Sequence, residues 1–274
     1  MKKLKFLLIM SCVAFLEISY GQTISGTATY MTSSKVRMDF DSTHVSPEQM
    51  QQMRSELAKK MQKEYDLVFD GTKSHWKQKE SLNSGPASVS SNGMEVMMMS
   101  GDENDVLYKD LKEQRFKRST ELMGKKFLVE DELPQYDWKM TGEKKKIGNY
   151  LCEQAIYQRI SDAKTFSSGE DEMKVIKDTV EIVAWFTPEI LVNNGPRNYH
   201  GLPGLIMELS NGFQKVICTK IVLNPTERVK IEVPNRGEKV SEQEFQAITE
   251  EKMKEMMNRY RGEGDGEIEI VIGG

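Results

Sequence analysis

Short runs of alternating apolar and polar residues recur along most of the chain, and turn-forming residues separate them. Such alternation is typical of half-buried strands. The sequence predicts strands over residues 24–31, 65–69, 94–99, 106–108, 114–118, 126–129, 138–141, 150–158, 179–186, 204–209 and 214–223. Alternating Glu and Ile over 267–272 are compatible with a short last strand.

A helical period occurs in two segments, 46–63 and 241–260. In the first, Ser46 is suited to the N-cap and Pro47 to the first helical position. Its apolar stripe consists of Met50, Met53, Leu57 and Met61. In the second, Ser241 and Glu244 have the spacing of a capping box. The apolar face of this helix consists of Phe245, Ile248, Met253, Met256 and Tyr260.

Polar segments between these elements predict turns and loops. Residues 81–93, rich in Ser, Gly and Asn, are expected to form a mobile surface loop, and 143–146 and 170–177 are expected to be charged turns. Strands outnumber helices and do not alternate with them. We therefore expect an α+β, mainly β fold, with an antiparallel sheet or half-barrel and a few packed helices.

The first 21 residues have the pattern of a secretory signal peptide. Lys2, Lys3 and Lys5 precede a short apolar run, and Ser19 and Gly21 are small residues before a cut at Gln22. The alternative is a buried N-terminal helix. We expect export to the periplasm or cell surface, with residues 22–274 forming a single strand-rich domain.

Composition narrows the function classes. The 274 residues carry a formal net charge of −4, which argues against a general nucleic-acid binder. No uninterrupted apolar run of 18 residues occurs, so we expect no transmembrane segment in the mature chain.

Catalytic motifs are missing from the sequence. The three histidines, His44, His75 and His200, are far apart, and no HExxH, CxxC, P-loop or GxSxG pattern occurs. We assign no catalytic residue and no cofactor, and expect a protein that is not an enzyme. A nucleophilic pair of Cys152 or Cys218 with His200 remains an alternative.

Two cysteines remain after the signal peptide, Cys152 and Cys218. In an oxidising compartment an even number of cysteines suggests a disulfide. The alternative is two separate buried thiols.

Methionine is common, and Met94, Met97, Met98 and Met99 cluster. Thioethers are ligands for Cu(I), so these four residues are candidates for a soft-metal site. Adaptable packing in the core or in a greasy groove is the simpler explanation.

Residues 193–204 combine several turn signals. Asn193-Asn194-Gly195-Pro196 favours a turn, and Pro203 restricts Leu202 to an extended conformation. We expect a tightly specified loop between two strands. As a binding loop it would offer Arg197, Tyr199, His200, Gly201, Leu202, Pro203 and Gly204 to a ligand or partner. As a structural corner it would only turn the sheet.

Two segments resemble the GLPGLI family. Residues 201–206 read GLPGLI, and residues 146–158, KIGNYLCEQAIYQ, have the aromatic, Cys and Ala pattern of that family. Gln154 stands where the family commonly has Lys. The resemblance implies an exported protein of Bacteroidota-type bacteria, in some cases encoded beside TonB-dependent receptors of the outer membrane. By fold-level analogy it also suggests a periplasmic lipoprotein-carrier fold.

These observations favour an exported, non-enzymatic binding or accessory protein of the cell envelope. Its ligand would be an apolar small molecule or lipid held by the sheet and the Met-lined helices. The alternatives are copper binding through the Met cluster and a structural partnership with an outer-membrane receptor.

Overall fold

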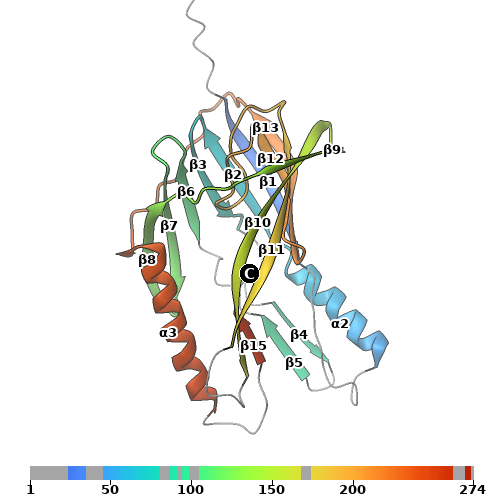
Figure 1. The fold of residues 1–274 in the computed structure, drawn as a ribbon, viewed down its shortest axis with the longest axis vertical. Coiled ribbons are helices and arrows are strands. Elements are labelled where there is room, and N and C mark those ends of the chain that lie inside the picture. Colours follow the sequence, from blue (N-terminus) through green and yellow to red (C-terminus); the bar gives the residue numbers. More distant parts are fainter. Residues whose placement is uncertain are drawn as a thin grey trace, which may run out of the picture.

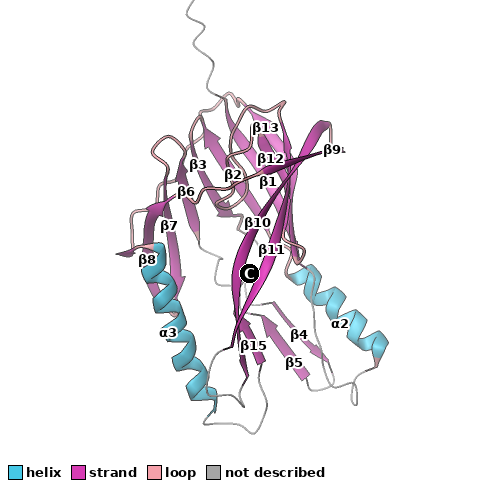
Figure 2. Cartoon of the chain, in the orientation of Figure 1, coloured by secondary structure: helices cyan, strands magenta, loops and turns pink. Residues whose placement is uncertain are grey.

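The computed structural model describes residues 24–34, 46–80, 87–91, 94–98, 105–167, 174–261 and 269–272. The predicted signal peptide lies outside the described residues. The fold is mostly β, with a long open sheet, a separate two-stranded sheet and two helices in the described part (Figures 1 and 2). The helices are α2 (Pro47–Lys60) and α3 (Glu242–Arg261). The strands are β1 (Ser25–Ser34), β2 (Glu64–Asp70), β3 (Lys73–Gln78), β4 (Ala87–Ser91), β5 (Met94–Met98), β6 (Val106–Asp110), β7 (Arg115–Leu122), β8 (Lys125–Glu132), β9 (Lys139–Ile147), β10 (Tyr150–Ser167), β11 (Lys174–Thr187), β12 (Leu205–Ser210), β13 (Gln214–Leu223), β14 (Glu238–Val240) and β15 (Glu269–Ile272).

The long sheet has the strand order β14-β8-β7-β6-β3-β2-β1-β13-β12-β11-β10-β15, and β9 also pairs with β10. Among the described strands of this sheet, all pairs are antiparallel except β14 with β8, so the sheet is mixed rather than purely antiparallel. Strands β10 and β11 are the longest, and Figure 1 shows them running from β9 down towards β15. Helices α2 and α3 lie on either side of this long hairpin.

Three predicted turns or loops are strands in part. Ala87–Ser91, inside the expected loop 81–93, form β4 and pair with β5. The expected turn 143–146 belongs to β9, and the chain turns later, at residues 148–149. Residues 174–177 of the expected turn 170–177 begin β11. In each case cross-strand hydrogen bonding outweighs the polar composition of the segment, because strand propensity depends strongly on context.

The apolar core lies on one face of the sheet. Directly opposed residues in adjacent strands share a face. One such row runs through Gly26, Phe69, Ser74, Lys109 and Phe116. Gly26 is buried, and the other four residues are buried to at least 97 %, so this row places the lysine among core residues.

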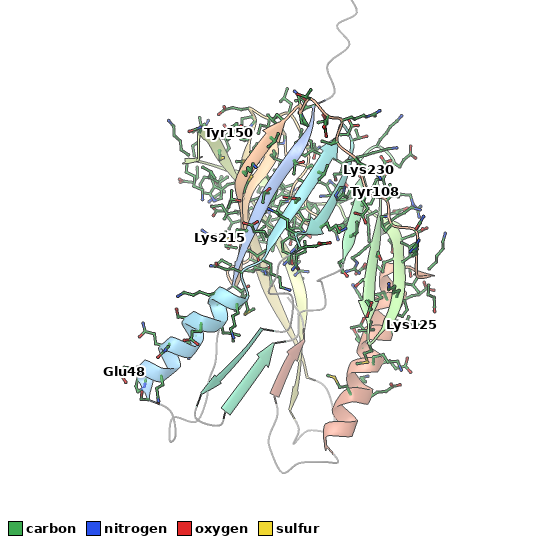
Figure 3. The ribbon with its side chains drawn as sticks, turned by 180° about the vertical axis from the view of Figure 1, so that it is seen from behind. Glu48, Tyr108, Lys125, Tyr150, Lys215 and Lys230 are labelled. Carbon is green, nitrogen blue, oxygen red and sulfur yellow. The ribbon has the colours of Figure 1, made fainter. Side chains whose placement is uncertain are left out.

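The opposite face of the sheet is partly covered by the chain between β13 and β14. Here the backbone N–H of Glu232 donates to Nδ1 of His75 at 3.0 Å, and Lys77 pairs with Glu232 at 3.1 Å. Figure 3 views the molecule from behind and shows Lys230 of this segment, with Tyr108 of β6 and Glu48 on the outer end of α2.

Candidate functional site

The loop between β11 and β12, residues 188–204, packs into the core. Its apolar side chains Ile190, Val192 and Leu202 are buried. Its backbone pairs with the start of β12, where Leu205 N–H donates to Ile190 at 3.1 Å and Ile206 N–H to Asn194 at 3.0 Å. The segment is therefore a folded part of the core.

Two glycines of this loop allow backbone and side chains to approach closely. A Cβ on Gly204 would lie 2.1 Å from the carbonyl oxygen of Thr187, and one on Gly195 would lie 2.6 Å from Ile206 Cδ1. Both distances are far below van der Waals contact. Both glycines are therefore required where the loop packs closely against β11 and β12.

The seven predicted binding residues do not form one surface. Arg197 has a positive φ of 53° and donates a hydrogen bond to Gln214 Oε1. Tyr199 is half-buried, His200 is buried, and Leu202 is part of the core. Gly201, with a φ of 95°, and Pro203 are exposed, and Gly204 is buried against Thr187. Tyr199 and His200 have ring contacts with further aromatic side chains.

Four half-buried rings, Tyr136, Trp138, Tyr157 and Tyr199, meet at one side of this loop, and we call them the aromatic cluster. Tyr136 stacks on Tyr199 with centroids 5.1 Å apart and meets Tyr157 edge-on at 5.3 Å. Burial raises the pKa of Tyr136 well above its usual value, and the neighbouring Tyr199 and Tyr157 add to this rise. Trp138 Nε1 donates to the carbonyl of His200 at 2.8 Å, which ties the cluster to the loop.

The aromatic cluster lies on the core face of the sheet. Tyr157 is directly opposite the buried Ile182, and Ala155, two residues before it, is opposite Ala184. Arg159 is the next residue on this face. Burial raises the pKa of both Tyr136 and Tyr199, and the positive charge of Arg159 partly opposes that rise. Its Nε is buried without a hydrogen-bond partner among the described residues.

A second group, which we call the buried polar cluster, consists of Ser74, Lys109, Asn194 and His200. The first three are fully buried, and His200 is 5 % exposed. Lys109 Nζ donates to the carbonyl of Gly195 at 2.8 Å, and Asn194 Nδ2 donates to Ser74 Oγ at 2.8 Å. No carboxylate of the described residues pairs with Lys109.

Burial sets the protonation of this cluster. It lowers the pKa of Lys109 to about 7. It also lowers the pKa of His200 to about 4, with Lys109 acting in the same direction and a hydrogen bond to Pro134 in the opposite one. His200 Nε2 has no partner in the described part of the chain. At neutral pH the imidazole is therefore neutral and the lysine is partly deprotonated.

A cleft of about 610 Å³ opens beside β3, at the segment 232–236. Its lining residues are Lys77, Gln78, Lys79, Glu80, Val106, Ser119, Glu232, Val233, Pro234, Asn235 and Arg236. Most of these side chains are polar or charged. The cleft is therefore not the apolar groove expected from the methionine-rich helices.

Cys152 and Cys218 are both buried free thiols in the structure, so the disulfide suggested by their even number is not formed there. Burial raises the pKa of Cys152 to about 11 and that of Cys218 to about 12. Neither thiol is paired with His200 by any described contact. The two cysteines lie in β10 and β13 as small apolar residues of the core.

The methionine cluster lies at the edge of what the structure describes. Met94, Met97 and Met98 belong to β5, but their side chains lie outside the described part, as does the whole of Met99. Their role as metal ligands stays a prediction. Among described residues, no group of three or more His, Cys, Asp or Glu side chains is placed to hold a metal ion.

The sequence analysis did not predict the aromatic cluster or the buried polar cluster. The rings of the aromatic cluster come from three segments and have no common motif. Lys109 does have a signal, since alternation in β6 places it on the same face as the buried Leu107. A lysine on the apolar face of a strand indicates a buried amine.

Comparisons with known proteins agree with part of the sequence analysis. A family model described as "Protein of unknown function (Porph_ging)" matches residues 138–208, a range that contains both segments quoted above. No curated protein matches the chain. In the described part, no helix is long and apolar enough to cross a membrane.

Structures of PNGF-II share a distant likeness with the chain. One in space group C2 has 11% sequence identity and a TM-score of 0.46, and covers 82% of this chain. One in space group P21 has 12% identity and a TM-score of 0.49, and covers 83% of this chain. The chain spans 32% and 33% of the length of these two structures. The family model alone assigns a relationship, and it links the segment 138–208 to a family without an assigned function.

Proposed function

We propose that this chain is an exported, non-enzymatic binding protein of the cell envelope, related to the GLPGLI family. Its ligand is an apolar small molecule or lipid with an acidic end. The aromatic cluster is the observation that carries this proposal. The signal-peptide pattern of residues 1–21 and the two motifs within 138–208 support export and the family relationship.

The aromatic cluster has the chemistry of a binding surface for apolar groups. Four rings offer a large, rigid apolar area that costs little conformational entropy to order on binding. Because the rings lie on the core face, a ligand there would extend the apolar core rather than sit on a polar surface. We propose that the open sheet binds its ligand on the apolar face, as a lipoprotein-carrier fold would.

The surroundings of Arg159 suggest that the ligand has an acidic end. Its buried Nε lacks a partner among the described residues, and an unpaired buried donor is costly. A carboxylate or phosphate oxygen beside Tyr199 would accept this hydrogen bond. An amphiphile with one anionic group would therefore satisfy both the rings and the guanidinium.

Calorimetric titration with decanoate, a soluble fatty acid, tests the proposal. We expect saturable binding, and weaker binding by at least about tenfold for Tyr199→Ala. Arg159→Met should lower affinity for decanoate but not for its methyl ester. Arg228→Met is the control, because the Arg228 side chain is 88% exposed and pairs with Asp70. Absence of heat with both the acid and the ester would refute this ligand class.

A second candidate function is docking to an outer-membrane TonB-dependent receptor. Leu191 of the loop is 75% exposed and Leu151 is 44% exposed. They lie on neighbouring segments, since Leu151 N–H donates to Glu189 Oε1 at 2.9 Å. Paired exposed leucines are suited to a protein interface.

Affinity capture from an envelope extract, with the receptor identified by mass spectrometry, tests the docking alternative. Leu191→Ser should lose the receptor while the protein stays folded, and Val222→Ser, at another exposed apolar residue, should retain it. Equal capture by both variants would exclude the leucine pair as the docking surface.

A further inference from the structure

The buried polar cluster contains an amine to which no described residue offers a counter-charge. Lys109 is fully buried. In the row of opposed residues its neighbours are Ser74 on one side, followed by Phe69, and Phe116 on the other. Among the described residues, its ammonium nitrogen donates only to a neutral backbone carbonyl, that of Gly195. A permanently charged ammonium in such a place is costly, so a neutral, nucleophilic amine is the favoured form.

The side-chain amide of Asn194 is connected to this amine through two shared neighbours, Gly195 and Ser74. Asn194 precedes Gly195, whose carbonyl binds Lys109, and its Nδ2 is held by Ser74, the residue directly opposite Lys109. The backbone N–H of Gly195 donates to Asn194 Oδ1 at 2.9 Å. A donor on that oxygen withdraws electrons from Cγ and stabilises the negative charge that develops on attack.

We propose that Lys109 and Asn194 form an intramolecular isopeptide bond. The lone pair of Nζ attacks Cγ of Asn194, and the charge of the tetrahedral intermediate falls on Oδ1. The Nζ–Cγ bond forms, the Cγ–Nδ2 bond breaks, and Nδ2 leaves as ammonia with one proton taken from Nζ. The reaction needs no oxidant, reductant or co-reactant.

His200 is placed to carry that proton. It pairs with Asn194 in an isolated antiparallel bridge, and its Nε2 is buried without a partner among the described residues. Lys109 is near enough for its charge to lower the pKa of this imidazole. A neutral imidazole takes a proton from Nζ and returns it to the departing nitrogen.

The consequence of the bond is a covalent tie between β6 and the β11–β12 loop. Oxidation does not make this bond and thiols do not break it. Such a tie would resist unfolding in the cell envelope without a disulfide, which accords with the two free thiols in the core.

Peptide mapping of the purified mature protein tests the proposal. We expect a peptide in which Lys109 is joined to Asn194, with a mass lower by one ammonia than the two parts. Trypsin should not cut after Lys109 in the linked form. Intact mass alone is insufficient, because an N-terminal Gln22 also loses ammonia when it cyclises.

Variants distinguish this bond from a second route that also releases ammonia. In the dipeptide Asn194-Gly195, attack by the backbone nitrogen on Cγ would give a succinimide. Lys109→Met, which keeps the side-chain volume and removes the amine, should abolish the linked peptide, whereas Lys230→Arg, at an exposed lysine, should retain it. Unlinked Lys109 and Asn194 in the wild-type protein after prolonged incubation above neutral pH, or a succinimide without a linked peptide, would overturn the proposal.

Discussion

Tyr30 donates its hydroxyl proton to the backbone carbonyl of Ile206 at 2.7 Å, in the fully buried core. Ile206 is the last residue of the GLPGLI hexapeptide. At this point β12 is not yet paired with β13, because that pairing covers only Glu208–Ser210. The tyrosine of β1 therefore satisfies a carbonyl that the sheet leaves open and anchors the exit of the loop.

Replacing Tyr30 with Phe should destabilise the protein by about 1–3 kcal/mol, because the carbonyl of Ile206 would be buried without a partner. Urea unfolding measures this change. Tyr150→Phe is the control, because Tyr150 is only half-buried and its hydroxyl makes no hydrogen bond with the described residues. Equal unfolding midpoints for the wild type and Tyr30→Phe would show that the bond contributes nothing.

Gly204→Ala should lower the free energy of unfolding by at least about 3 kcal/mol, the upper end of the usual cost of overpacking. The new methyl group would meet the Thr187 carbonyl, which belongs to the backbone and has little room to move. Gly212→Asn is the comparison: no atom lies near a Cβ there, and Asn tolerates the positive φ of 85°. Thermal unfolding midpoints of the two variants measure the difference, and similar midpoints would contradict the expected clash.

The helices were predictable because their signals are local. Ser46 accepts a hydrogen bond from the backbone of Gln49, and Ser241 exchanges hydrogen bonds with Glu244, as a capping box requires. β4 was missed because serine-rich composition was read as a loop. The dipeptide Asn92-Gly93 between β4 and β5 is a hairpin signal that would have indicated the pair.

The candidate sites were less predictable because they depend on tertiary pairing. Lys109 and Gly195 are 86 residues apart in the sequence, and no local pattern reports that their strands and loop meet. His200 was predicted only as a member of a candidate binding loop, because its surroundings could be known only once the β11–β12 loop was seen to fold into the core.

His200 should make the stability of the protein depend on pH in the acidic range. Its pKa is about 4 in the folded state and near 6.5 when unfolded, so the unfolded state binds more protons between these values. The contribution of His200 is fully present above pH 6.5 and is lost as pH falls towards 4, with a slope of at most about 1.4 kcal/mol per pH unit. Burial is the larger cause, so the direction holds whether or not Lys109 is a free amine.

Urea unfolding of the wild type and His200→Gln between pH 4 and 7 isolates this contribution. The difference between the two proteins should shrink as pH falls, because only the wild type takes up a proton there on unfolding. Acidic side chains titrate in both proteins and cancel in the comparison. A constant difference across this range would mean that His200 does not titrate as burial predicts.

Cys152 and Cys218 should be unreactive in the folded protein and reactive once it unfolds. The thiolate is the nucleophile, and burial raises the pKa values to about 11 and about 12, so almost no thiolate exists at neutral pH. Alkylation of the native mature protein with iodoacetamide should modify neither cysteine, whereas alkylation in denaturant without a reductant should modify both. If the denatured protein reacts only after reduction, the two sulfurs are bridged in the exported protein and the core around β10 and β13 rearranges to join them.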